Sequence, residues 1–188
     1  VRARFPWLEP GLPYEVGYGD VALVFLDSET RLAAQGRWLA RRLAGLEARH
    51  AAVVVFMHRA PYTDTTEPEP ERMHAIRAHL IAPLRRTSLT TLVFSGHEHG
   101  YERLRFDGID FVVTAGGGGA RERLRAERPH DVYTGPDCRH EHAGTVLRPF
   151  NYVLLRRTSA GLEVRTRGLC RNEVEVGGID AFRIRLRR

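Results

Sequence analysis

Apolar residues are concentrated in four short runs separated by mixed polar stretches. These runs are VALVFL at 21–26, AAVVVFM at 51–57, TTLVFS at 90–95 and IDFVVTA at 109–115. Nearly continuous apolar runs of this length are typical of strands that are buried on both faces of a parallel sheet. The sequence therefore predicts four buried strands.

The stretches between the first three runs have helical periodicity. Over residues 30–49, Leu32, Trp38, Leu39, Leu43 and Leu46 recur at the spacing of an amphipathic helix, and residues 72–86 predict a second helix. The resulting order β-α-β-α-β-β predicts the α/β class, with a sheet covered on both faces.

The two ends of the chain have a different pattern. Residues 1–18 are rich in Pro, Gly and aromatic residues and predict an irregular lead-in. Residues 120–148 are polar and predict a long loop. Apolar and polar residues alternate in 150–158, 161–169 and 180–188, which predicts antiparallel strands with one solvated face. Residues 1–188 are expected to form one domain.

Composition excludes some classes of function. The net charge is +6, and all 29 basic residues are arginine, which a GC-rich coding sequence explains as well as phosphate binding does. The arginines form no dense basic helix, so nucleic acid is not favoured as a partner. No apolar run approaches the roughly 18–20 residues of a membrane span, so no membrane association is expected.

The cysteines and the first residue leave questions open. Cys138 and Cys170 either pair in an oxidising compartment or are both free. The chain begins with Val in a stretch typical of a loop inside a domain, so we expect a processed product or a fragment.

Distinctive polar groups follow the predicted strands. His58 follows the second run, His97 and His99 follow the third, and Gly116–Gly119 follow the fourth. Ligands of α/β sheets bind at the carboxyl ends of strands, and imidazole is the commonest metal-binding side chain. The sequence therefore predicts a metal site with His58, His97 and His99 as ligands.

A second set of metal-binding residue types lies in the long loop. Cys138, His140 and His142 repeat the His-x-His spacing beside a thiol, which is a ligand set that suits zinc. The alternative is a polar loop whose composition happens to include them.

Three ordered segments resemble the calcineurin-like metallophosphoesterases, in the branch that includes purple acid phosphatases. These are YEVGYGDVALVFLDSETRLAAQGRWLARRLA, VVVFMHRAPY and SGHEHGYER, and the glycine run after FVVTA also matches. The resemblance covers about residues 10–120 and is weaker in the terminal strands.

The resemblance implies a fold, a cofactor and a reaction. The family has a four-layer α/β sandwich and a pair of Fe, Mn or Zn ions that hydrolyses small or macromolecular phosphate esters. His58 and His97 match ligands of one metal, and His99 matches a ligand of the other. Tyr62, Tyr101, Gly116 and Gly117 match positions at the substrate rim. The branch also implies a secreted or periplasmic protein, although the sequence alone leaves the compartment unknown.

The sequence also departs from the family pattern. The family's Asp-x-His, Gly-Asp and Gly-Asn-His motifs, which supply further ligands, are absent. Asp20 precedes its strand and Asp27 matches a structural aspartate, so neither replaces them. The chain therefore corresponds to the C-terminal half of the domain.

Three hypotheses follow from the sequence. The chain is part of a metal-dependent phosphoesterase that is inactive by itself, or a degenerate member that serves as a binding module. The third hypothesis is anion or nucleic-acid binding through the arginines, which their scattered positions do not favour.

Overall fold

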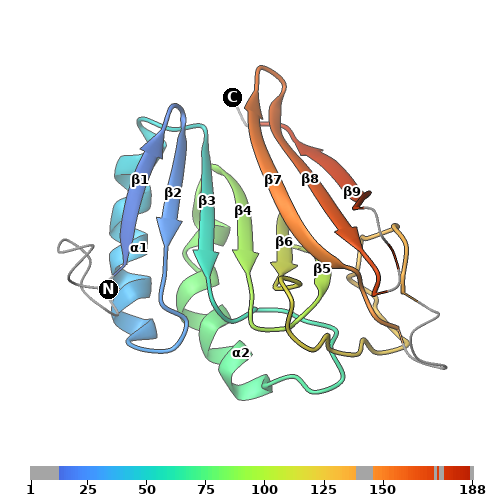
Figure 1. Cartoon of the computed structure of the whole chain (residues 1–188). Coiled ribbons are helices and arrows are strands. Elements are labelled where there is room, and N and C mark those ends of the chain that lie inside the picture. Colours follow the sequence, from blue (N-terminus) through green and yellow to red (C-terminus); the bar gives the residue numbers. More distant parts are fainter. Residues whose placement is uncertain (1–12, 139–145, 172, 174–175, 187–188) are drawn as a thin grey trace, which may run out of the picture.

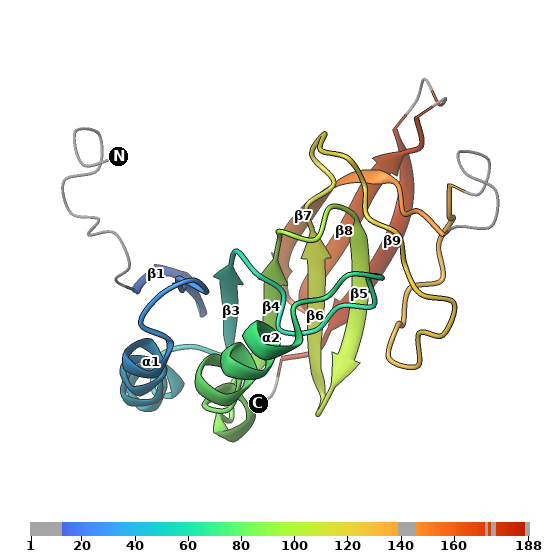
Figure 2. The same cartoon turned by 90° about the horizontal axis from the view of Figure 1, so that it is seen from below.

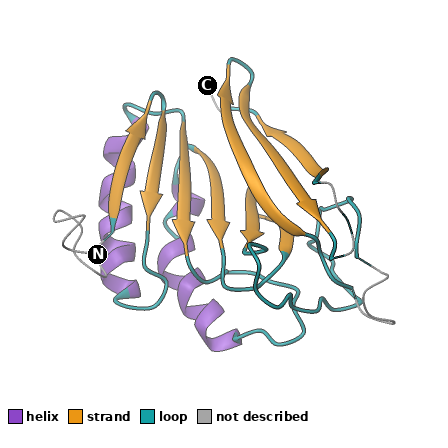
Figure 3. Cartoon of the chain, viewed as in Figure 1, coloured by secondary structure: helices purple, strands orange, loops and turns teal. Residues whose placement is uncertain are grey.

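The computed structural model describes residues 13–138, 146–171, 173 and 176–186. They form a helical layer, a mixed six-stranded sheet and a three-stranded antiparallel sheet (Figures 1 and 3). The mixed α/β class is therefore confirmed. The second face of the large sheet is covered by strands, not by helices, and the described residues supply three of the four layers that the resemblance implies.

The large sheet has the strand order β1-β2-β3-β4-β6-β5. Strands β2, β3, β4 and β6 run parallel, whereas β1 and β5 are antiparallel strands at the two edges. The strands are β1 (Tyr14–Tyr18), β2 (Val21–Phe25), β3 (Ala52–Met57), β4 (Thr90–Ser95), β5 (Tyr101–Phe106) and β6 (Ile109–Thr114).

Two of these strands differ from the expectation. The Pro- and Gly-rich composition of residues 1–18 predicted a lead-in without regular structure, but β1 pairs with β2 over five residues. Residues 101–103 were interpreted as the end of the SGHEHGYER motif and no strand was predicted there, although Tyr101 and Leu104 are buried on opposite faces of β5. Both are edge strands, so neither has the continuous apolar run that identifies a central strand.

The helices cover one face of the large sheet. Helix α1 (Leu32–Glu47) buries Leu39, Leu43 and Leu46 against it. The second predicted helix is divided into α2 (Pro70–Ile76), a π-helical segment (Arg77–Ile81) and a 3₁₀ turn (Leu84–Arg86). Proline at 83 offers no backbone N–H, which explains why the regular helix does not continue to residue 86. In the described residues no helix is both long and apolar enough to cross a membrane.

The second sheet has the order β7-β8-β9 and packs on the other face of the large sheet. Its strands are β7 (Phe150–Thr158), β8 (Gly161–Leu169) and β9 (Gly177–Ile184). Figure 2 shows this sheet opposite the helices, mainly over β4, β6 and β5. Between β6 and β7 the described residues form only isolated bridges, such as Leu124 with Val146.

Candidate functional site

The parallel strands bring their carboxyl ends to one edge of the large sheet. His58 follows β3, His97 follows β4 by two residues, and Gly116 follows β6 by two residues. The backbone N–H of Gly96 donates to the carbonyl of His58 at 2.8 Å, which ties the two turns together. His97 itself has a φ of 67°, so the histidine and not Gly96 adopts the left-handed conformation at this bend.

His58 and His97 are brought together as predicted. His97 Nδ1 lies 3.1 Å from His58 Nε2, and the rings are nearly perpendicular with centroids 4.9 Å apart. Two imidazoles on one tetrahedral zinc ion, each at about 2.0–2.1 Å, place their nitrogens roughly 3.3 Å apart. The separation therefore suits either a hydrogen bond between the rings or two ligands of one ion.

An arginine occupies the other side of His97. Arg59 Nη1 lies 3.0 Å from His97 Nε2, and the same guanidinium pairs with Glu29 and Glu69. A guanidinium only donates hydrogen bonds, so Nε2 of His97 accepts, which places the proton of the neutral ring on Nδ1. In this tautomer Nδ1 of His97 donates a hydrogen bond to Nε2 of His58. A metal ion bound by both nitrogens would require this hydrogen bond to break.

His99 is not part of this pair. Its Nδ1 donates to the carbonyl of Ala120 at 2.9 Å, and a Cβ at Gly119 would lie 2.5 Å from its ring. His99 is therefore held by the loop after β6. Across the described part of the chain, no group of three His, Cys, Asp or Glu side chains is close enough to hold a metal ion.

Two buried carboxyl groups lie in the loop that carries His97 and His99 and in the strand that follows it. The sequence pattern did not indicate that they would be buried. Glu98 and Glu102 are both more than nine-tenths buried. Burial raises the pKa of Glu98, and the adjacent carboxyl of Glu122 raises that pKa further. Burial also raises the pKa of Glu102 to about 7, although hydrogen bonds from the Thr63 hydroxyl and the Asp64 amide favour its charged form. Glu102 thereby fastens the loop after β3 to β5.

The raised pKa of Glu102 predicts a pH-dependent stability. The unfolded carboxyl ionises near 4.5 and the folded one near 7, so this contribution is complete below about pH 4.5 and is lost as the pH rises to about 7. This difference between the folded and unfolded pKa of Glu102 corresponds to a loss on the order of 3 kcal/mol from the free energy of unfolding. Urea unfolding from pH 4.5 to 8 should show a smaller decrease for Glu102→Gln than for the wild type. The exposed control Glu67→Gln should retain the wild-type decrease, and an equal decrease in Glu102→Gln would contradict the assignment.

The two predicted rim tyrosines are buried. Tyr62 stacks on Phe106 with ring centroids 3.8 Å apart on the helix side of the sheet, and its hydroxyl accepts a hydrogen bond from Arg85. Tyr101 lies between the two sheets and donates to Asp180 at 2.8 Å. Their rings fill the core, so neither lines an open rim.

The glycines predicted at the rim have different surroundings. A Cβ at Gly116 would lie 2.1 Å from the side-chain amide nitrogen of Asn151, so Gly116 allows β7 to approach β6 closely. Gly117 has nothing within 4 Å of that position, and it borders open space beside β7. Gly117 is therefore the more accessible of the two.

The alternative metal site predicted in the long loop cannot use Cys138 as a ligand. Cys138 forms a disulfide with Cys170, so it has no free thiolate to offer a metal. The disulfide also answers the question that the sequence left open about the two cysteines. His140 and His142 lie outside the described residues.

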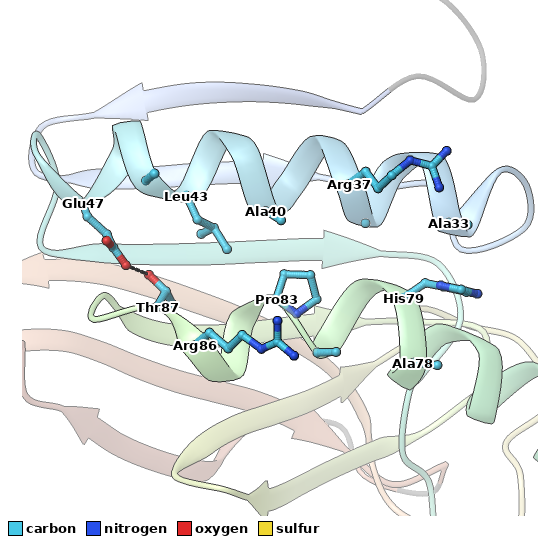
Figure 4. A pocket seen from close by; sticks show the side chains of 13 residues that line it. Ala33, Arg37, Ala40, Leu43, Glu47, Ala78, His79, Pro83, Arg86 and Thr87 are labelled. Carbon is cyan, nitrogen blue, oxygen red and sulfur yellow. Dashed lines mark hydrogen bonds between the residues drawn. The ribbon is translucent and has the colours of Figure 1, made fainter.

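A cavity of about 520 Å³ lies away from these histidines, between α1 and the segment that follows α2 (Figure 4). Alanine side chains line it together with larger ones such as Arg37 and Arg86, and a Cβ at Gly36 would lie 2.2 Å from the carbonyl oxygen of His79, so the two helical segments touch there. The Thr87 hydroxyl donates to Glu47 at 2.6 Å beside it. None of the predicted site residues lines this cavity.

Two solved structures resemble this fold. One is GAP50, the anchor in the inner membrane complex of Plasmodium, with a TM-score of 0.68 and 10% identity over 97% of this chain and 57% of that chain. The other is a dimetal phosphatase from Danio rerio, with a TM-score of 0.51 and 14% identity over 89% of this chain and 60% of that chain. No protein-family model and no curated protein matches the sequence.

At these identities the likeness concerns the fold alone. The chain has a mixed α/β fold similar to that of a dimetal phosphatase. It spans less than two thirds of the length of either similar structure.

Proposed function

We propose that the chain forms one side of a metal-dependent phosphoesterase centre, of the purple acid phosphatase-like branch, and corresponds to the C-terminal half of that domain. The observation that carries the proposal is the 3.1 Å approach of His58 Nε2 and His97 Nδ1 at the carboxyl ends of β3 and β4. Support for the class comes from the likeness of the fold to a dimetal phosphatase. The substrate is a phosphate ester.

The described residues do not fit a complete pair of Fe, Mn or Zn ions. His58 and His97 fit two positions on one ion, whereas His99 is held by the Ala120 carbonyl and Arg59 presents a positive charge to His97. A pair of ions also needs carboxylates to balance its charge, and no suitable group of three ligands lies in the described part of the chain. The proposal therefore assigns the remaining ligands to polypeptide outside the 188 residues.

Metal titration of single histidine variants tests this assignment. With Zn²⁺ as the probe, calorimetry on the 188-residue chain should detect one weakly bound ion. His58→Ala and His97→Ala should each lower its affinity at least tenfold, because each removes one of two nitrogens. His99→Ala and the exposed control His74→Ala should change the affinity less than twofold.

Activity provides the second readout. A longer chain that includes the polypeptide encoded upstream of Val1 should bind about two ions and hydrolyse p-nitrophenyl phosphate. Both properties should be lost in His58→Ala. A longer chain that binds metal without hydrolysing the ester, or binding that is unchanged in His58→Ala, would contradict the proposal.

A non-catalytic binding module is the second candidate. It is favoured by the hydrogen-bonded chain from Arg59 through His97 to His58, which satisfies the histidines without a metal. It is also consistent with a fold shared with GAP50, which is described as an anchor. This candidate predicts cooperative unfolding of the 188-residue chain and no Zn²⁺ binding in the titration above, and aggregation of that chain would exclude it.

A further inference from the structure

Side chains from three loops meet at Nε2 of His97, the ring nitrogen that does not face His58. Arg59 lies in the loop after β3, Glu29 in the loop after β2, and Glu69 directly before α2. Nη1 of Arg59 donates to Nε2 of His97 at 3.0 Å and also to Oε1 of Glu69. Its Nε donates to Oε1 of Glu29 at 2.6 Å. One guanidinium therefore joins His97 to two carboxylates.

The backbone is restrained where it carries the arginine and the second carboxylate. The N–H of Arg59 donates to the hydroxyl of the fully buried Ser28 at 2.7 Å. Glu69 lies between Pro68 and Pro70, whose rings restrict its backbone, and its φ of −101° and ψ of 83° lie outside the helical region. The side chain of Glu69 is 52% exposed, so a change of its rotamer displaces nothing from the core.

Glu69 also offers His97 a second hydrogen-bond partner. Its Oε1 lies 3.6 Å from Nε2 of His97, which is just longer than a hydrogen bond. A neutral imidazole has one donor nitrogen and one acceptor nitrogen, so Nε2 either accepts from Arg59 or donates to Glu69. These two arrangements place the ring proton on opposite nitrogens of His97.

The position of this proton decides whether Nδ1 of His97 can bind an ion beside His58. When Nε2 accepts from Arg59, Nδ1 carries the proton and donates to Nε2 of His58 at 3.1 Å. When Nε2 donates to Glu69, Nδ1 instead has a free lone pair on the side of His58. Metal-binding histidines almost always donate their other N–H to a carboxylate, a backbone carbonyl or water, which orients the ring. Glu69 meets this requirement, whereas Arg59 opposes it.

We propose that Arg59 and Glu69 set the tautomer of His97, with Glu69 as the positioning residue of the metal-competent ring and Arg59 as its competitor. When Arg59 withdraws, Nε2 takes a proton from water and donates it to Glu69, while Nδ1 loses its proton to water, so the ring stays neutral. The consequence for metal binding rests on the proposed function, whereas the tautomer does not. The inference gives a role to the acidic segment 67–71, which lies outside the segments that resemble the phosphoesterases.

Nitrogen-15 NMR of the metal-free 188-residue chain tests the tautomer directly. At about pH 8, where an unperturbed imidazole is neutral, the shifts of the two ring nitrogens show which one is protonated. The wild type should show His97 protonated on Nδ1, and Arg59→Met should show it protonated on Nε2. The spectrum of His97→Ala identifies the signals. Arg31→Met removes the same charge from an exposed position between β2 and α1 and should keep the wild-type pattern.

Calorimetry with Zn²⁺ tests the consequence for metal binding. Arg59→Met should raise the affinity at least tenfold, because it removes a competing donor and a positive charge. Adding Glu69→Ala to Arg59→Met should lower the affinity again by at least tenfold, whereas adding the exposed control Glu67→Ala should change it less than twofold. Glu29→Gln loosens the guanidinium through its other partner and should raise the affinity in the same direction, which provides a result if Arg59→Met does not fold.

Two NMR results would overturn the inference. One is His97 protonated on Nε2 in the metal-free wild type, and the other is an unchanged tautomer in Arg59→Met. An unchanged Zn²⁺ affinity in Arg59→Met, in a chain that still loses binding in His58→Ala, would reject the competition and retain the proposed function. The expected change of tautomer without Zn²⁺ binding in any variant would retain the control of His97 by Arg59 and reject the phosphoesterase centre.

Discussion

Replacing Arg148 with alanine is expected to remove about 3 kcal/mol from the free energy of unfolding. The Arg148 side chain is 3% exposed and pairs with Asp131 and Asp137, which are 7% and 12% exposed. It also lies over the ring of Tyr133 at 3.9 Å. Breaking a buried pair by removing one partner costs about 3–5 kcal/mol, because the other charge is left buried. The lower value is expected because Arg128 still faces Asp131 at 3.4 Å.

Two further variants separate the charge from other effects. Arg148→Met keeps most of the side-chain volume over Tyr133, so a loss similar to that of Arg148→Ala would assign the effect to the unpaired carboxylates. Arg165→Ala is the matched control, because Arg165 is 61% exposed and its pair with Glu163 should contribute less than about 1 kcal/mol. Urea unfolding followed by circular dichroism measures all three. A loss below about 1 kcal/mol for Arg148→Ala would show that the pair adds nothing to the fold.

The central strands could be predicted from sequence because each is buried on both faces. Strands β3 and β4 consist almost entirely of buried residues, so their apolar runs have no polar interruption. Strand β1 is different, since its inner face carries the exposed side chains of Tyr14, Val16 and Tyr18. Without a described layer over that face, its composition resembles a loop. The pattern of burial, and not strand propensity, decided which strands were recognised.

The candidate site could be predicted only for side chains whose positions are determined by the ends of parallel strands. Parallel strands place His58 and His97 at one edge, and their nitrogens lie 3.1 Å apart. The direction of His99 depends on the loop after β6, which holds it through the Ala120 carbonyl. The pairing of Arg59 with Glu29 joins residues 30 positions apart, through loops whose conformation no periodic pattern encodes. The positions of the histidines at the sheet edge could therefore be predicted, whereas the orientations of their rings could not.

The long loop between β6 and β7 shows the same limit. Its polar sequence predicts an irregular segment, yet Cys138 is 3% exposed, and its backbone N–H donates to Leu147 at 2.8 Å. Arg121 donates to the Cys138 sulfur and to the carbonyl of Arg148. Specific pairs of distant polar groups and one disulfide, rather than an apolar run, fix this segment on the β7–β9 sheet.

Removing the disulfide should therefore have the second large effect on stability. Cys138 and Cys170 are 32 residues apart, and closing a loop of that length lowers the entropy of the unfolded chain by an amount worth about 3–4 kcal/mol at 25 °C. The double variant Cys138→Ser/Cys170→Ser should lose this stability in urea unfolding. Dithiothreitol should destabilise the wild type by a similar amount and leave the double variant unchanged.

Zn²⁺ binding measured before and after reduction of the disulfide shows which part of the fold the bond stabilises. Cys170 follows β8 directly, so the bond fastens the long loop to the second sheet and not to the histidine edge. The Zn²⁺ binding that we propose for His58 and His97 should therefore survive reduction under conditions where the chain stays folded. If reduction abolished Zn²⁺ binding while circular dichroism still showed a folded chain, the loop would be part of the metal site. If reduction changed neither binding nor stability, the bond would not form in the protein in solution.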